Sequence, residues 1–278
     1  MSQLLPLGLS SACLGDDFTL EALPAVAEAG FTHIEVFPAK VPWLQTLQDF
    51  ELLGQRTRES GLVTWSLHAP FGHHISPAAA DETRRGAAVD AMTGALTQAE
   101  ALGAGVVIIH PGYYDPQADD RGEALERAAS TYNEIAPEAS RRGLRLALEY
   151  LPPKPADLGC SAAELLWFRE RIAGDIGFCL DVNHANLPET LPEVVRRLGP
   201  SLLTTHLSDN DGHEEKHWLP GEGVIDWPAL MGALGEAAYR GPLLLEAGNF
   251  AANDLEQKLA ALAQAAHGLQ AAQGTPDR

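Results

Sequence analysis

Residues 103–112 read G-A-G-V-V-I-I-H-P-G, which is a glycine turn, an apolar run and then a histidine. The residues before them place apolar side chains on one helical face, at spacings of three and four: Ala88, Met92, Ala95, Leu96, Ala99 and Leu102. Glycine often closes a helix because it tolerates the left-handed backbone conformation. The run lacks polar alternation, which is typical of a strand covered on both faces. The segment therefore predicts a helix, a tight turn and a buried parallel strand.

The same unit recurs along the chain. Apolar runs occupy residues 32–37, 63–68, 106–110, 145–150, 176–181, 202–207 and 243–246, and each follows a glycine: Gly30, Gly61, Gly103, Gly143, Gly174, Gly199 and Gly241. We interpret each glycine as the residue that ends a helix before a strand. Residues 5–12 add a first strand with no helix before it, so the sequence predicts eight strands.

Eight such units in succession predict an α/β fold of the (β/α)8 TIM barrel class. We expect a single domain over residues 1–270 and a flexible C-terminal tail over residues 271–278, which read AAQGTPDR. An open, doubly wound sheet is the structural alternative, but no G-x-G-x-x-G pattern follows the first strand.

Composition excludes several classes of protein. The chain has 278 residues, 45% of them hydrophobic, and its 19 basic and 38 acidic side chains give a formal net charge of −19. Its three cysteines form no C-x-x-C pair, which argues against a disulfide framework or a cysteine zinc site. No apolar stretch is long enough to span a membrane and no signal pattern opens the chain, so we expect a cytoplasmic protein. The negative charge opposes nucleic acid as a partner, and it leaves a homo-oligomer open.

Metal-binding side chain types stand at the ends of the predicted strands, where TIM barrels carry their chemistry. They are Glu35, His68, His110, Glu149, Asp181, His206 and Glu246. Several carboxylates at one barrel mouth repel each other unless they bind a cation. We therefore expect one divalent ion (Mn²⁺, Mg²⁺, Co²⁺ or Zn²⁺) held by Glu149, Asp181, His206 and Glu246. Taken alone, Glu35 or any one histidine fits a structural hydrogen bond equally well.

The segment after the seventh strand, residues 206–228, is rich in turn formers and acidic residues. Gly221 and Gly223 provide flexible backbone, and Asp226 fits the N-cap of a following helix. We interpret His213 as part of a solvated polar loop.

Seven motifs together carry a family resemblance. They are S-L-H-A-P at 66–70, H-P-G at 110–112, L-E-Y at 148–150, D-x-x-H at 181–184, H-L-S-D-N at 206–210, E-K-H-x-x-P-G-E-G-x-I-D-W at 215–227 and L-L-L-E at 243–246. From Leu5 to about Leu269, the chain resembles the xylose-isomerase-like barrel superfamily, which includes sugar or sugar phosphate isomerases and epimerases and the endonuclease IV repair enzymes. In the sugar isomerase branch, the resemblance implies that Glu149, Asp181, His206 and Glu246 bind the metal. It also implies that His184 contacts a substrate oxygen.

The endonuclease IV branch provides an alternative function, a multi-zinc phosphodiesterase. Its metal positions match at His68, His110, Glu149, Asp181, His184, His206, His217 and Glu246, and Glu215 stands where that family has Asp. Three local sequences depart from that branch: Tyr113-Tyr114, Leu151-Pro152-Pro153 and the P-G-E-G-V-I-D-W form of the later loop. A metal-dependent sugar dehydratase or lyase and a sugar-binding barrel are the remaining alternatives.

Our preferred interpretation is a metal-dependent isomerase or epimerase acting through a metal-stabilised enediolate. Glu149 and Glu246 would remove and return a proton, and His184 would orient a substrate hydroxyl. We expect His68, His110, Glu215 and His217 to bind further metal or substrate, with Glu35 and Lys216 as weaker substrate contacts. The chain lacks both an arginine between His206 and Pro228 and a glycine-rich phosphate loop. A neutral sugar, a keto-inositol or a sugar acid therefore fits as well as a sugar phosphate.

Overall fold

The computed structural model of the chain describes residues 4–273 and has eight parallel strands wound into a barrel. The strands are β1 (Leu7–Ser10), β2 (His33–Val36), β3 (Val63–His68), β4 (Val106–Ile109), β5 (Arg145–Glu149), β6 (Ile176–Asp181), β7 (Leu202–His206) and β8 (Leu243–Leu245). Each of the eight predicted strands is present, and the predicted TIM barrel is confirmed.

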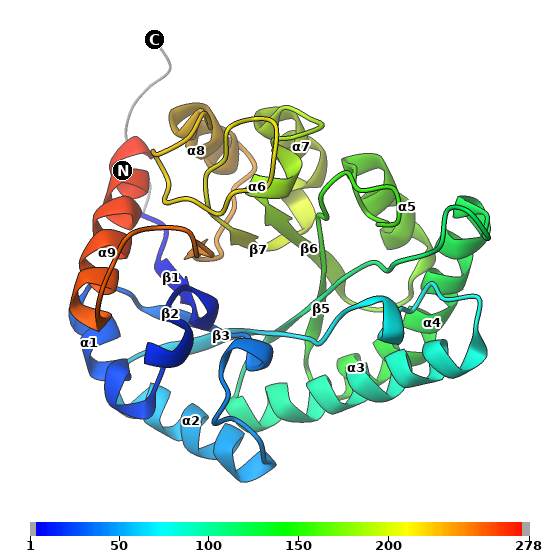
Figure 1. Cartoon of the computed structure of the whole chain (residues 1–278), viewed down its shortest axis with the longest axis horizontal. Coiled ribbons are helices and arrows are strands. Elements are labelled where there is room, and N and C mark those ends of the chain that lie inside the picture. Colours follow the sequence, from blue (N-terminus) through cyan, green and yellow to red (C-terminus); the bar gives the residue numbers. More distant parts are fainter. Residues whose placement is uncertain (1–3, 274–278) are drawn as a thin grey trace.

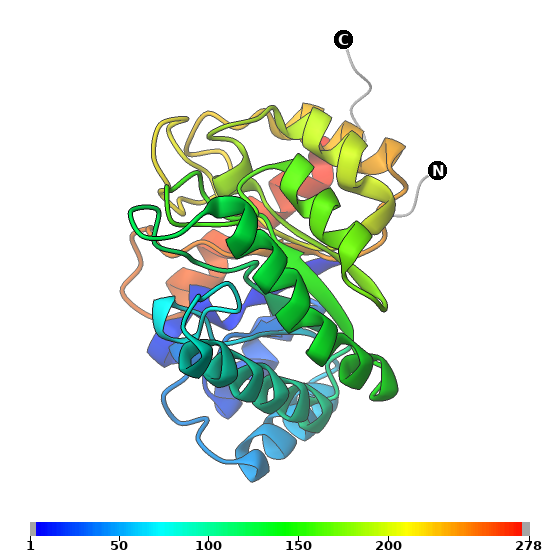
Figure 2. The ribbon, with the colours of Figure 1, turned by 90° about the vertical axis from the view of Figure 1, so that its right-hand side faces the viewer.

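Helices form a shell around the strands, as Figure 1 shows along the barrel and Figure 2 from the side. They are α1 (Leu23–Glu28), α2 (Leu47–Glu59), α3 (Glu82–Leu102), α4 (Arg121–Arg141), α5 (Ala162–Arg171), α6 (Val182–Ala185), α7 (Leu191–Leu198), α8 (Trp227–Glu236) and α9 (Leu255–Ala272). Short 3₁₀ helices cover Ser11–Cys13, Gly15–Asp17, Leu20–Ala22, Pro38–Lys40, His73–Ile75 and Gly199–Ser201. Asp226 caps α8 as predicted, because its side chain accepts from the N–H of Ala229. In the described part of the chain, no helix is long and apolar enough to cross a membrane.

The barrel closes between β7 and β8 through short contacts rather than a full ladder. The hydrogen-bonded strand order is β7-β6-β5-β4-β3-β2-β1-β8. A parallel bridge joins Leu207, after β7, to Leu245 at the end of β8. Leu207 N–H donates to Leu244 O at 2.8 Å, and Glu246 N–H donates to Leu207 O at 3.1 Å. This closure brings the residues that follow β7 and β8 to the same rim as the ends of the other strands.

Alternation along the strands separates two apolar clusters. Val107 and Ile109 join the large cluster that includes helix residues, whereas Val106 and Ile108 belong to a small cluster with Ala147, Cys179 and Leu203. Successive side chains of a strand point to opposite faces of the sheet, so the small cluster fills the barrel interior. Two residues further along the same faces come His110, Glu149 and Asp181. The pleat therefore directs these three polar side chains inward at the carboxyl end of the barrel.

Five of the seven repeat glycines have the expected left-handed backbone, for example Gly103 at φ 76° and Gly143 at φ 71°. Gly199 does end α7 as its C-cap residue, but at φ −46° and not with a left-handed backbone. The interpretation is wrong for Gly241, because α8 ends at Glu236 with Ala237 as its C-cap residue. Close packing explains both: a Cβ on Gly199 would stand 2.5 Å from the Cβ of Ala237, and one on Gly241 would stand 2.6 Å from the carbonyl oxygen of Leu203.

The tail predicted over residues 271–278 falls at the edge of the described chain. Helix α9 continues through Ala272, so the first two residues of that segment are helical. Residues 274–278 lie outside the described residues.

Candidate metal centre

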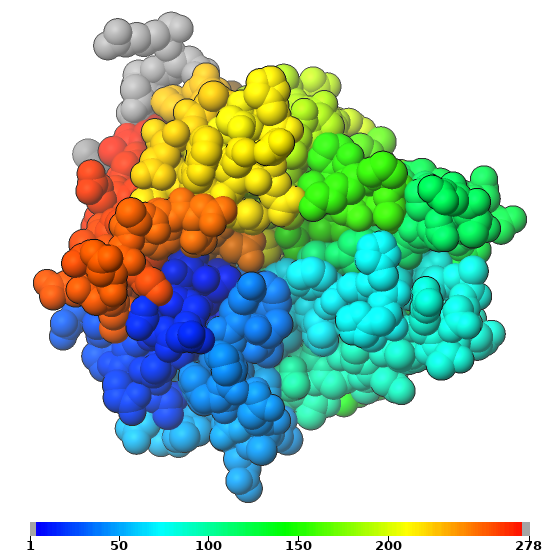
Figure 3. All heavy atoms as spheres, viewed as in Figure 1, coloured from blue at the N-terminus to red at the C-terminus, as the bar shows by residue number. Residues whose placement is uncertain are grey.

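A cavity of about 750 Å³ opens at the carboxyl ends of the strands. Figure 3 shows the hollow near the centre of this face, where segments from both halves of the chain meet. Seven of the predicted site residues line it: His68, His110, Glu149, His184, Glu215, His217 and Glu246. Its volume suits a small molecule, and its polar floor is built from strand ends.

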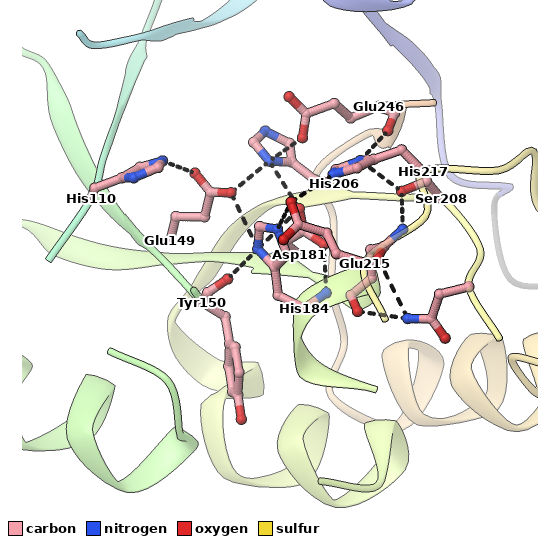
Figure 4. Close-up of polar contacts among 12 residues, drawn as sticks. His110, Glu149, Tyr150, Asp181, His184, His206, Ser208, Glu215, His217 and Glu246 are labelled. Atoms are coloured by element: carbon pink, nitrogen blue, oxygen red, sulfur yellow. Dashed lines mark hydrogen bonds and ion pairs between the residues drawn. The ribbon is translucent and has the colours of Figure 1, made fainter. Parts of the chain in front are cut away.

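The four residues predicted to hold a metal lie together at this floor. Ligand atoms of Glu149, Asp181, His206 and Glu246 all lie within 4.8 Å of one another. His206 is central, because its Nδ1 lies 3.4 Å from Glu149 Oε1 and 3.0 Å from Glu246 Oε2 (Figure 4). Strand register sets this geometry by pairing Asp181 with His206, and the closure of the barrel brings Glu246 alongside.

The charges of this group fit a cation. Asp181 is fully buried, and its Oδ2 has no hydrogen-bond partner. Burial and the nearby Glu149 and Glu246 raise the pKa of Asp181, although His184 opposes the shift. Burial also acts to raise the pKa of Glu149, but His110 and His206 outweigh it and hold that pKa well below its ordinary value. An unpartnered buried oxygen among three carboxylates is the donor set that a divalent ion satisfies.

A second group shares Glu149 with the first. Nε2 of His68 lies 3.1 Å from Glu149 Oε2, and Nε2 of His110 lies 3.0 Å from the same oxygen. The other ring nitrogens are occupied, since His68 Nδ1 bonds the carbonyl of Ala69 at 2.9 Å and His110 Nδ1 bonds the hydroxyl of Tyr113. Both imidazoles therefore point their Nε2 atoms at one carboxylate oxygen.

A third group lies toward the loop after β7. Glu215 Oε1 lies 3.2 Å from His217 Nε2 and 3.5 Å from His184 Nε2. Burial acts to lower the pKa of His184 and of His217, but nearby carboxylates outweigh it and raise each to about 9. Lys154 also contacts this group, with Nζ 2.8 Å from Glu215 Oε2. The structure thus brings the nine predicted polar residues at the mouth into three adjacent groups.

Glu35 and Lys216, expected as weaker substrate contacts, do not line the cavity. Glu35 is fully buried beneath the floor and bonds His206 and Ser66. The Lys216 side chain pairs with acidic residues of its own loop, because its Nζ lies 2.6 Å from Glu214 Oε2 and 3.4 Å from Asp211 Oδ2. His213 is exposed, in agreement with a solvated loop.

Sequence reasoning missed Asp209, which organises the loop that supplies Glu215 and His217. This buried carboxylate accepts hydrogen bonds from the N–H groups of Asn210, Gly221 and Ile225 and from Nε1 of Trp227. Its position beside Asn210 and Asp211 is typical of a solvent-exposed turn, and the pattern therefore gave no indication of a buried carboxylate. The signal that could have identified Asp209 was Trp227, because the indole N–H of a buried tryptophan usually has a hydrogen-bond acceptor.

The aromatic wall of the cavity was also missed. Phe37 stacks on His68 with ring centroids 4.4 Å apart, and Phe71 stacks on His110 at 3.9 Å. Lys154 and Asp157 add two ionisable side chains to the lining. Each follows a strand end by only a few residues, which was a usable positional signal.

Comparison with known proteins places the chain in a family. A family model described as "Xylose isomerase-like TIM barrel" matches residues 23–270. The chain belongs to this family. Among its relatives, protein MJ1311 of Methanocaldococcus jannaschii is 28% identical to this chain over 247 aligned residues. The match covers 87% of this chain and 83% of that protein.

Other relatives of this xylose isomerase-like barrel carry two kinds of name. Fructoselysine 3-epimerase of Escherichia coli O157:H7 is 28% identical over 174 residues, covering 60% of this chain and 61% of that enzyme. Probable endonuclease 4 of Alkaliphilus oremlandii is 26% identical over 228 residues, covering 76% and 77%. Among solved structures, a D-tagatose 3-epimerase-like protein superposes with a TM-score of 0.81 at 25% identity, covering 95% of this chain and 98% of that one.

Proposed function

We propose that this protein is a divalent-metal-dependent sugar isomerase or epimerase that transfers a proton next to a carbonyl group. The observation that carries the proposal is the placement of Glu149 and Glu246. Both line the cavity, and they approach Nδ1 of His206 to 3.4 and 3.0 Å from the ends of β5 and β8. Two carboxylates across one floor suit removal of a proton and its return from another side.

The four-residue group supplies the metal site in this proposal. When bound, a divalent cation provides Lewis-acid stabilisation of the negative charge that develops as a proton leaves carbon. Glu149, Asp181, His206 and Glu246 would hold it, and the unpartnered Oδ2 of Asp181 supports that assignment.

Proton transfer would fall to the two glutamates. One carboxylate takes the proton from the carbon beside the carbonyl, and the protonated form of the other delivers a proton to that carbon. Hydrogen bonds from the two Nε2 atoms of His68 and His110 hold Oε2 of Glu149. Those contacts fix the direction of the Glu149 carboxylate toward the cavity. His184 would orient a substrate hydroxyl, since its Nδ1 is held by the carbonyl of Tyr150 at 2.9 Å.

The cavity favours a small polar substrate with one apolar side. Phe37 and Phe71 form one wall, and the ligand groups form the floor. Lys40 and Lys154 are its lysines, and no arginine of the described chain lines it. A neutral sugar, a keto-inositol or a sugar acid fits this lining without the arginine clamp that suits a phosphate. The names of the fructoselysine 3-epimerase and the D-tagatose 3-epimerase-like protein support the same substrate class.

A multi-metal phosphodiesterase is the second candidate, favoured by one observation. Three groups of ligand type share one mouth, and Glu149 belongs to two of them. Clustered cations can activate water and neutralise a phosphate. The net charge of −19 opposes this candidate, because a nucleic acid binder gains its affinity from basic side chains.

Incubation of the metal-loaded protein with a panel of ketoses in deuterium oxide tests the proposal. We expect deuterium at a carbon beside the carbonyl, detected by NMR, and loss of that exchange after chelation. Abasic-site DNA should stay intact in parallel. Metal-dependent strand cleavage, together with three zinc ions per chain in elemental analysis, would replace our proposal with the second candidate. Release of water from a sugar substrate without epimer formation would instead indicate a dehydratase.

A further inference from the structure

A buried carboxylate lies directly beneath the candidate metal group. Glu35, the third residue of β2, is fully buried, and it does not line the cavity. Its Oε2 lies 3.1 Å from Nε2 of His206 and accepts a hydrogen bond from Ser66 Oγ at 2.8 Å. Its Oε1 has no hydrogen-bond partner. Burying a carboxylate this way is costly, which calls for a compensating role.

The two nitrogens of the His206 ring face different surroundings. Nδ1 faces Glu149, Asp181 and Glu246 at 3.4, 3.9 and 3.0 Å. Nε2 faces Glu35. An imidazole binds a metal through an unprotonated nitrogen, so ligation through Nδ1 requires the proton to sit on Nε2. Glu35 Oε2 stands at the distance of an acceptor for that proton.

We propose that Glu35 is a positioning residue, which fixes the tautomer and the ring orientation of His206 for metal binding. The inference rests on the proposed metal-dependent function. Ser66 completes the arrangement, because its hydroxyl holds the same carboxylate oxygen. A chain of hydrogen bonds thus runs from β3 through β2 to β7 across the barrel interior. Carboxylates that accept the second N–H of a metal-bound histidine are typically worth about 10–100-fold in metal affinity.

The test compares metal affinity and folding in Glu35→Gln, Glu35→Ala and Ser66→Ala. We expect Glu35→Ala to weaken affinity for Zn²⁺ or Mn²⁺ by about 10–100-fold, measured by competition with a chromophoric chelator. Glu35→Gln keeps an acceptor oxygen for Nε2–H and loses the charge, so its affinity should fall between those of the parent and Glu35→Ala. Ser66→Ala should show the smallest effect, because the contact with His206 remains.

The matched control is Glu189→Gln, another carboxylate with structural hydrogen bonds, to the hydroxyl of Tyr150 and the N–H of Ala162. Its metal affinity should equal that of the parent. A second readout is ¹⁵N NMR of the Zn²⁺-loaded protein, which should show Nε2 of His206 protonated in the parent and changed proton exchange at Nε2 in Glu35→Ala.

Two failures are distinguishable. A parent protein that binds no divalent metal refutes the proposed function. A parent that binds metal, with Glu35→Gln and Glu35→Ala binding equally tightly, refutes the positioning role alone. If Glu35→Ala does not fold, Glu35→Gln and the NMR signature decide, and unchanged affinity in Glu35→Gln with an unprotonated Nε2 in the parent overturns the inference.

Discussion

Asp181 contacts His184 twice, through a hydrogen bond to the backbone and through an ion pair with the ring. Oδ1 of Asp181 accepts the backbone N–H of His184 at 3.1 Å, which caps α6. The ring Nδ1 lies 3.3 Å from Asp181 Oδ2 but bonds the carbonyl of Tyr150, at 2.9 Å. Asp181 Oδ2 accepts no hydrogen bond and lies among the carboxylates of the floor. One oxygen of Asp181 therefore caps the N-terminus of α6, and the other would be the cation ligand in our proposed function.

Removing this charge should have opposite effects with and without metal. In metal-free protein, Asp181→Asn keeps the Oδ1 cap and relieves repulsion with Glu149 and Glu246, so we expect unfolding free energy to rise by about 1 kcal/mol. Adding metal at 100 times its Kd stabilises the parent by about 2.7 kcal/mol, and the variant should lose most of that gain. Thermal melts with chelator and with Mn²⁺ measure both effects. Equal metal stabilisation in the two proteins would contradict the ligand role of Asp181.

Neutralising either floor glutamate should stop proton transfer. We expect Glu149→Gln and Glu246→Gln each to slow exchange of solvent deuterium into the substrate by at least about 100-fold, because each removes a carboxylate from the reacting carbon. The control is Glu236→Gln, an exposed change on α8. Exchange at the parent rate in both floor variants would rule out the two-glutamate mechanism.

Asp209 should stabilise the conformation of the loop that follows β7. Asp209→Ala leaves the N–H groups of Gly221 and Ile225 and the indole of Trp227 without their acceptor. We expect it to lower the free energy of unfolding by about 3 kcal/mol in urea denaturation, since buried donors lose charged partners. It should also weaken binding of metal at Glu215 and His217. The neighbouring Asp211→Ala removes two exposed backbone contacts and an exposed ion pair with Lys216, and it should cost below about 1 kcal/mol.

The capping box at the start of α2 should stabilise the fold in a pH-dependent way, through the carboxylate of Asp49. Hydrogen bonds from the backbone N–H and the hydroxyl of Thr46 and the backbone N–H of Gln45 lower the pKa of Asp49 below 3.8. A depressed folded-state pKa means that this stabilisation is present above pH 3.8 and is lost as pH falls through the lowered value. The melting temperature of Asp49→Asn should therefore lie below that of the parent at pH 7 and approach it as pH falls through the lowered pKa of Asp49. A constant difference across this range would contradict the assignment.

Much of the fold follows from local pattern. The run Val106–Ile109 and its counterparts are apolar because both faces of a parallel strand are covered. Such a run can be recognised in the sequence without knowledge of any tertiary contact. The ends of seven of the eight strands are equally visible, because a histidine or carboxylate interrupts the run there. Gly199 and Gly241 show where pattern reasoning fails. Both look like glycines with a left-handed, helix-closing backbone, yet neither has it. A side chain is excluded at these positions because Ala237 and Leu203 pack against them from distant segments.

The sequence by itself determined which residue types gather at the barrel mouth, since eight strand ends must meet at one rim. Tertiary structure decided what each side chain does there. The register shift of β2 and β3 between Ile34 and Glu35 accompanies a Glu35 that is buried under His206 and does not line the cavity. Lys216 pairs with its own loop, while Glu149 meets His68, His110 and His206 at once. Roles of this kind depend on distances between residues far apart in the chain, and local periodicity carries no information about those distances.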